Sequence, residues 1–198
     1  MNTPLKTTLR SAMANALFIT FLGGMLPMMA PPAMAAEQAA APERNPPGDI
    51  PDSQVFVTFK SPAGFSVRVP EGWARTERKN GARFADKFNA VDIDISAAAA
   101  LPTVASVKNG QAAELVKTGR AVNIKMVKNV KLTAGSAILI VYESNSEPNP
   151  VTNKQLRLEN NRYLTYRNGK LATLYLAAPL GADNVDQWQL IAHSLHWN

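Results

Sequence analysis

The chain has 198 residues, with 21 lysines and arginines against 15 acidic residues and no cysteine. The absence of cysteine excludes disulfide bonds, thiolate metal sites, a thiol nucleophile and a lipid-modified cysteine. The formal charge of +6 could attract anionic lipid headgroups, cell-wall polymers or acidic proteins. The alternative is that the charged residues only solvate the exposed faces of strands and keep the protein soluble. No basic-aromatic signature of nucleic-acid binding is present.

The first 35 residues have the anatomy of a signal peptide. Lys6 and Arg10 form a positive region, an apolar stretch follows, and Ala33-Met34-Ala35 is an A-x-A cleavage site. The apolar stretch before Pro27 is short for a spanning helix, although a retained anchor is the alternative. We predict cleavage near Ala35 and a periplasmic or secreted protein. Removing 35 of the 198 residues leaves 163, with a formal charge of +4, which suits one domain and a tail.

Residues 36–52 contain four prolines among small and polar residues. Such a composition buries no core and favours extended polyproline II structure. We therefore predict a flexible tether over 36–52 and a folded domain over 53–198.

Strand patterns dominate the start of the domain. Apolar residues alternate with polar ones over 55–59 and again over 65–69, which predicts two strands. Asn80-Gly81 is a type I′ hairpin signal between residues 75–79 and 82–88.

The next predicted strand, residues 91–95, has two different faces. Its odd-numbered residues are apolar, whereas Asp92 and Asp94 share the other face, with Cα atoms about 6–7 Å apart. The two carboxylates are candidate cation ligands or an acid-base pair, and the alternative is a solvated strand face. Calcium requires more oxygen ligands than this pair supplies. Nearby residues that could add them are Asp86, Asn89 and Ser96.

A helix is predicted over residues 103–118, weakened by Gly110 and ended at Gly119. Residues 122–132 and 136–144 then predict a strand pair. The second of these strands is apolar on both faces, as is typical of a central strand covered on both sides.

A second hairpin is predicted at Asn168-Gly169, again a type I′ signal. A two-residue turn there would place Tyr163 opposite Leu174. The strand that precedes this hairpin is predicted to break at Asn160-Asn161.

The last helix has the strongest pattern. Asp183 is the predicted N-cap, and Asp186 adds negative charge in the first turn. His193 falls nearly opposite the apolar stripe, so it is predicted to be exposed. The stripe consists of Val185, Trp188, Ile191, Ala192 and Leu195.

The order of strands, one helix, a four-strand meander and a closing helix resembles the superfamily that includes the PsbP oxygen-evolving-complex proteins and Ran-binding proteins of the same fold. The resemblance covers roughly Phe59 to Trp197. It implies an α+β fold, with an αβα sandwich around an antiparallel sheet and a C-terminal amphipathic helix, and non-enzymatic roles in assembly, docking or ligand binding. The residues that carry it are Gly64 to Trp73, Arg83-Phe84, Gly135, Tyr163, Trp188 and Ser194-Leu195.

The late segments of the chain are similar to those of exported bacterial members, which are often lipoproteins of unassigned function. These segments are residues 148–152, 181–186 and 194–197. The chain departs from those lipoproteins because it lacks the lipidated cysteine.

Catalytic and metal-binding motifs are not evident. His193 and His196 are the only histidines, and a zinc site would need further ligands. Neither a G-x-S-x-G elbow nor a glycine-rich phosphate loop occurs. We therefore predict no enzyme activity, no cofactor and no metal.

One cluster remains as a candidate binding surface: Arg157, Arg162, Tyr166 and Arg167. Tyrosines beside arginines suit anionic or aromatic partners, although strand tyrosines are also common core-edge residues. The sequence favours an exported, monomeric, non-catalytic module that docks onto an envelope protein. The alternatives are a carrier of a small apolar or anionic, lipid-like ligand held between sheet and helix, a hydrolase without a recognisable motif, and peripheral association with membrane or cell wall.

Overall fold

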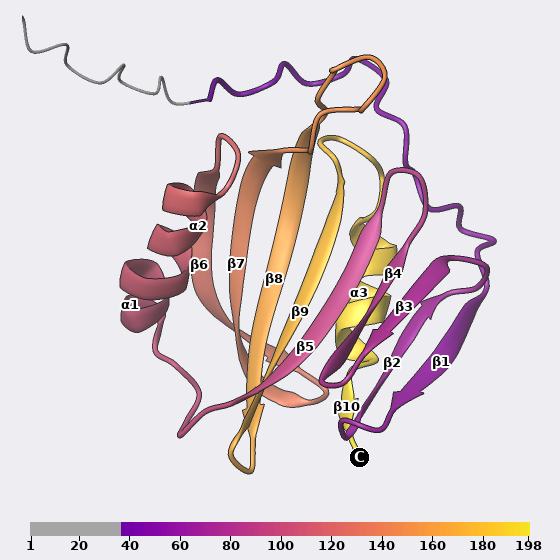
Figure 1. Ribbon diagram of the computed structural model, residues 1–198. Coiled ribbons are helices and arrows are strands. Elements are labelled where there is room, and N and C mark those ends of the chain that lie inside the picture. The colour runs from indigo at the N-terminus through magenta and orange to yellow at the C-terminus, as the bar shows by residue number, and fades with distance from the viewer. Residues whose placement is uncertain (1–36) are drawn as a thin grey trace, which may run out of the picture. The chain divides into compact units, whose positions relative to one another are not determined.

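The computed structural model describes residues 37–198 (Figure 1). The predicted signal peptide and its cleavage site lie outside these residues. Within residues 37–198, no helix is long and apolar enough to cross a membrane.

A seven-stranded antiparallel sheet forms the centre of the domain, in the order β3-β4-β5-β9-β8-β7-β6. Strands β6 to β9 form the predicted meander. Strand β5, which precedes them in the chain, pairs with the last of these strands, β9. The bounds are β3 (Ala74–Arg78), β4 (Gly81–Ala85), β5 (Ala90–Ala97), β6 (Asn123–Leu132), β7 (Gly135–Asn145), β8 (Arg157–Arg167) and β9 (Lys170–Pro179).

One face of this sheet is covered by a three-stranded sheet and a helix, and the main core lies between them. The small sheet has the order β1-β2-β10, and the helix is α3 (Val185–His193). Trp188, Ile191 and Leu195 from the C-terminal segment pack with Phe65 and Val67 of β2 in this core. The strands of the small sheet are β1 (Phe56–Ser61), β2 (Phe65–Pro70) and β10 (His196–Trp197).

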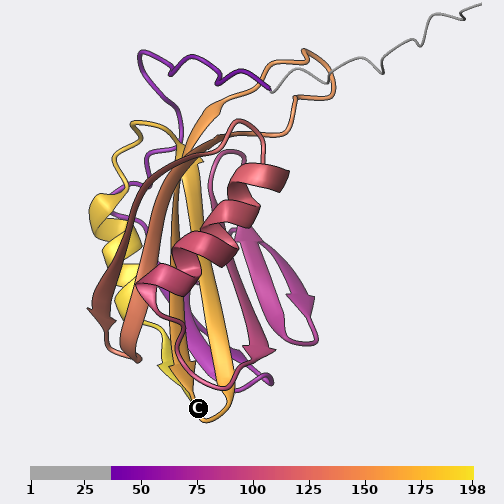
Figure 2. The same cartoon turned by 90° about the vertical axis from the view of Figure 1, so that its left-hand side faces the viewer.

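The opposite face carries a helical segment made of α1 (Val104–Val107), the π-helical stretch η1 (Lys108–Ala112) and α2 (Ala113–Thr118). Its buried Val107 packs in a second core with apolar residues of β7 and β8. Figures 1 and 2 show this helix lying beside β6, whereas α3 lies on the other side of the sheet. The predicted α+β class, the antiparallel sheet and the C-terminal helix are confirmed.

The two Asn-Gly signals have different outcomes. Asn168 and Gly169 have φ of 48° and 81°, and Tyr163 pairs with Leu174 as predicted. The first hairpin turns instead at Lys79-Asn80, because Arg78 pairs with Gly81. A Cβ atom on Gly81 would lie 2.1 Å from the Ile93 carbonyl oxygen. This glycine is therefore required by the close approach of β5, not by the turn.

The predicted break at Asn160-Asn161 is wrong, because β8 runs through both residues. The Asn160 side chain is fully buried but hydrogen-bonded. Its Nδ2 donates to the Tyr142 carbonyl at 3.2 Å, and its Oδ1 accepts from the Tyr175 hydroxyl at 2.8 Å. Neighbouring strands thus satisfy a polar group that the sequence pattern marks as a strand breaker.

Helix α3 begins one residue later than predicted, with Asn184 rather than Asp183 at its N-cap. The Asn184 side chain does not cap the helix; its Oδ1 accepts from the Ile50 backbone N–H at 2.7 Å. The predicted stripe is otherwise confirmed, except that Val185 is 66% exposed.

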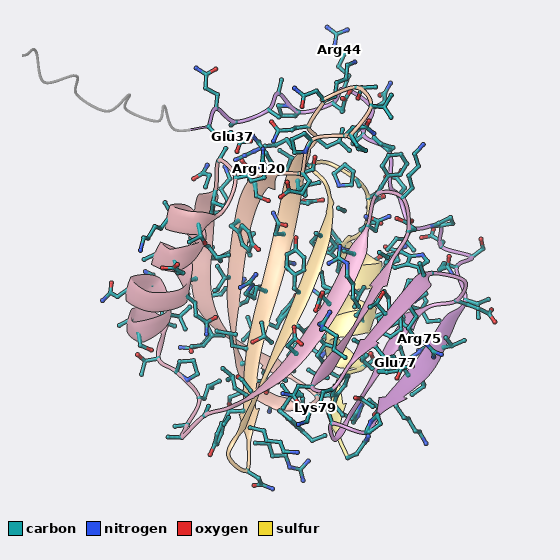
Figure 3. All side chains as sticks on the ribbon, viewed as in Figure 1. Glu37, Arg44, Arg75, Glu77, Lys79 and Arg120 are labelled. Carbon is teal, nitrogen blue, oxygen red and sulfur yellow. The ribbon has the colours of Figure 1, made fainter. Side chains whose placement is uncertain are left out.

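Residues 37–52, here called the N-terminal strap, pack against the domain, so the prediction of a flexible tether before Ser53 is wrong. Ile50 is only 4% exposed, and the Ala40 N–H donates to Asn145 Oδ1 at 2.9 Å. Glu37 forms an ion pair with Arg120 at 3.4 Å (Figure 3). The prolines favour an extended chain, and buried contacts with the ends of the sheet hold that extended chain in place.

Candidate functional site

Part of the large sheet carries no helix on the side of α1 and α2 (Figure 1). On this side a row of paired residues crosses four strands: Arg83 of β4, Asp92 of β5, Tyr175 of β9 and Arg162 of β8. All four are at least partly exposed. We call this row the open sheet face.

Arg162 is held in place by two tyrosines. Its guanidinium carbon lies 5.6 Å from the centre of the Tyr175 ring, which is within the range of a cation-π contact. Burial raises the pKa of the Tyr142 hydroxyl, although the charge of Arg162 and a hydrogen bond from it act in the opposite direction. Burial likewise raises the pKa of Tyr175. Both hydroxyls therefore stay neutral at physiological pH and serve as hydrogen-bonding groups.

The other two arginines of this region are neutralised, and Arg162 is not. Arg78 donates to Asp94 at 2.9 Å and also pairs with Asp92, while Arg83 lies 3.4 Å from Asp92. Within residues 37–198, Arg162 has no carboxylate within ion-pair distance. Its Nε is buried and has no hydrogen-bond partner there. A partly desolvated cation of this kind suits a carboxylate, phosphate or sulfate group.

These ion pairs also bear on the candidate cation site. Arg78 lies between Asp92 and Asp94 and bonds to both. In the described part of the chain, no group of three or more histidine or acidic side chains is arranged to hold a metal ion. The structure therefore favours an ion-pair role for the two aspartates.

The predicted cluster of four site residues does not form one surface. Arg157 is 5% exposed, and its Nη1 donates to the Ala121 carbonyl at 2.7 Å and to Asn145 at 3.1 Å. Its Nη2 lies 3.2 Å from Glu143. The proposal of Arg157 as a binding residue is thus corrected: its guanidinium joins the end of β7 to the segment before β6.

Of the remaining three, Arg162 and Tyr166 share a face of β8, since they are four residues apart on one strand. Arg167 lies on the opposite face and is exposed at the hairpin end. Tyr175 was missed, although the predicted hairpin register places it opposite Arg162. Asp92 was predicted only as a cation ligand or acid-base residue, and Arg83 only as part of the family resemblance. The sequence did not place either of them beside Arg162, because that depends on the long-range pairing of β5 with β9.

Both histidines are exposed, as predicted for His193. They border a hollow of about 400 Å³. Ser194 lies between them, but its hydroxyl donates to the Ile191 carbonyl and accepts from the Arg68 N–H, each at 2.7 Å. The serine is thus used to join α3 to β2.

No protein-family model matches the chain, and no curated protein matches it in sequence. Among solved structures, the cyanobacterial PsbP (CyanoP) of Synechocystis sp. PCC 6803 aligns with a TM-score of 0.51 at 15% identity, covering 76% of this chain and 98% of that one. The Ran-binding protein Mog1p of Saccharomyces cerevisiae gives 0.49 at 8% identity, covering 73% and 96%. LpqN of Mycobacterium tuberculosis, involved in cell envelope biogenesis, gives 0.46 at 15%, covering 72% and 89%.

The domain has a PsbP-like fold, as the sequence resemblance predicts. This conclusion rests on CyanoP, almost all of which is covered. At 15% identity the likeness concerns the fold alone, so a function has to be argued from the residues of this chain.

Proposed function

We propose that this protein is an exported, non-catalytic docking module whose open sheet face binds an acidic segment of an envelope protein. The observation that carries the proposal is Arg162, which is partly buried against Tyr175 and has no carboxylate partner among residues 37–198. A carboxylate supplied by a partner would complete this ion pair.

The shape of the surface favours a macromolecular partner over a small ligand. A carrier surrounds most of its ligand within a concave site. The hollows of about 350, 400 and 410 Å³ are lined by residues outside the open sheet face. A sheet face outside these hollows, with one uncompensated charge, is instead expected to contact another protein surface.

The energetics also favour this use of Arg162. Its guanidinium is already partly desolvated and oriented by stacking, so a partner carboxylate would displace little further water. Removal of one member of such a pair weakens binding by about 2–5 kcal/mol. We therefore expect Arg162 to dominate the affinity of this face.

The test is site-specific crosslinking in the native envelope. A photo-crosslinking residue at Thr173, which is partly exposed beside Asp94, should capture one protein in stoichiometric amount. The same residue at the exposed Lys60 of β1 should not. Arg162→Gln should abolish the product, whereas Arg167→Gln, on the same strand but the opposite face, should leave it unchanged.

Two controls keep the experiment decisive. Circular dichroism and the melting temperature must show that Arg162→Gln is folded. An identical crosslinking pattern in a folded Arg162→Gln protein would rule out the proposed surface. A small bound mass in native mass spectrometry of the exported protein would instead support the carrier alternative.

A further inference from the structure

The basic charge of the domain is concentrated in one region. Residues 104–132, which form the helical segment and β6, contain six lysines and arginines and a single acidic residue, Glu114, for a net charge of +5. Residues 37–198 together carry +4, so everything outside this region sums to −1. The positive charge of the domain therefore lies on the surface formed by residues 104–132, a location that the net charge of the chain alone does not reveal.

Much of this charge is free of internal partners. Arg120 pairs with Glu37 and Glu147, and Lys125 pairs with Glu143 at 2.9 Å. The other four lysines are exposed and form no ion pair within residues 37–198. They are Lys108, Lys117, Lys128 and Lys131.

An apolar groove opens between the same two elements. Its volume is about 350 Å³. Lys108 and Lys125 border it, and its lining includes Ala112, Val116 and Met126. Val116 is 53% exposed and Met126 is 41% exposed, so two large apolar side chains face solvent beside the lysines. Figure 2 views the domain from this side, with the helix in front of the sheet.

We propose that the surface formed by α1, η1, α2 and β6 docks the domain onto an anionic lipid surface. Exposed apolar side chains flanked by lysines are typical of structures that rest in the interfacial layer of a membrane. In the docked state the lysines contact the lipid headgroups, and the acyl chains contact Val116 and Met126, which line the groove. Arg162 lies on β8, which β7 separates from β6. The lipid-docking surface therefore uses the β6 edge of the sheet and none of the four residues of the open sheet face.

The test is sedimentation of the protein, exported and purified from cells, with lipid vesicles. Vesicles containing phosphatidylglycerol should bind it, pure phosphatidylcholine vesicles should not, and binding should weaken as salt is raised. Each neutralised lysine should reduce binding about fivefold. Lys108→Gln with Lys117→Gln, both exposed on the helical segment, should therefore reduce it about 25-fold.

The matched control is Lys60→Gln with Lys154→Gln, two exposed lysines outside this surface, which should leave binding unchanged. Val116→Ser, at an exposed position, should weaken binding without changing the melting temperature. Equal binding to both vesicle types, no binding to the anionic ones, or an equal loss in the control pair would each overturn the proposal. Capture of a soluble acidic protein by this surface without vesicle binding would overturn it as well.

Discussion

At the residue scale, two carboxyl groups that face each other across β7 and β8 are in opposite electrostatic situations. Burial raises the pKa of Glu159, and the nearby Glu143 carboxylate adds to this, although the Gly181 N–H donates a hydrogen bond that opposes it. Burial also disfavours the charge on Glu143, but Lys125 and Arg157 prevail and hold the pKa of Glu143 below its usual range. One charge therefore destabilises the fold and the other stabilises it.

The raised pKa of Glu159 predicts a pH-dependent stability. The folded state binds this proton more tightly than the unfolded state, so stability is lost as pH rises from the unfolded pKa through the folded pKa. Glu159→Gln should therefore raise the melting temperature at pH 7 and change it little at pH 4. Thermal melts of both proteins at the two pH values measure this.

Glu143→Gln is the matched control, and it should behave in the opposite way. Because the pKa of Glu143 is lowered in the folded state, its contribution is present at neutral pH and is lost as pH falls through its folded pKa. The variant should be less stable at pH 7, with a smaller difference in acid. Equal effects of the two substitutions at pH 7 would contradict this assignment.

Buried polar residues mark where prediction from the sequence stops at this scale. From the sequence alone, Arg157 is a residue type expected on a binding surface. Asn160, next to a second asparagine, is a residue type expected in a loop. Their hydrogen-bond partners Ala121 and Tyr142 lie far away in sequence. Only the pairing of β8 with β7 shows that these polar groups are satisfied internally.

At the element scale, a local turn signal gives the correct turn where no other strand crowds the Cβ position of the glycine. The Asn168-Gly169 turn and the register of its strands follow from two residues that tolerate positive φ. At Asn80-Gly81 the same signal is displaced by one residue, because β5 approaches Gly81 too closely for a side chain. The site follows the same rule: Arg162 and Tyr166 were identified from one strand, whereas Arg83 and Asp92 come from strands whose position is set by long-range pairing.

The amphipathic pattern of α3 leads to a quantitative prediction. Trp188 is 6% exposed in the main core, so Trp188→Ala should destabilise the protein by about 3–5 kcal/mol. Val185→Ala, at a position of the same helix that is 66% exposed, should change stability by less than about 0.5 kcal/mol. Urea unfolding of both variants measures the difference, and similar losses would mean that the buried face of the helix is misassigned.

At the scale of the whole molecule, the large sheet has three environments. One face is covered by α3 and the small sheet, part of the other by the helical segment, and the rest is the open sheet face. The alternation of apolar and polar residues predicts strands with one apolar and one polar face. It does not predict which strands have a face that no helix covers, because that depends on where the helical segment lies. The candidate binding surface therefore emerges only from the assembled fold.

The N-terminal strap is the other feature of the whole molecule, because it joins the start of the domain to its last helix. Ile50 is buried and its N–H donates to Asn184. The side chain of Asp49 accepts the Asp183 N–H at 2.9 Å. The strap thus supplies hydrogen-bond partners to the segment that begins α3, across more than 130 residues of sequence.

Loss of the Ile50 side chain should therefore weaken both the fold and the docking of the strap. Ile50→Ala should cost about 2–4 kcal/mol in urea unfolding, as for other buried aliphatic residues, and should expose the strap to proteolysis. Glu43→Ala, at an exposed strap position, is the control and should change neither. A flexible tether would give the same small effect for both substitutions, with cleavage in the strap already rapid in the unmodified protein. A loss confined to Ile50→Ala means instead that residues 37–52 fold as part of the domain.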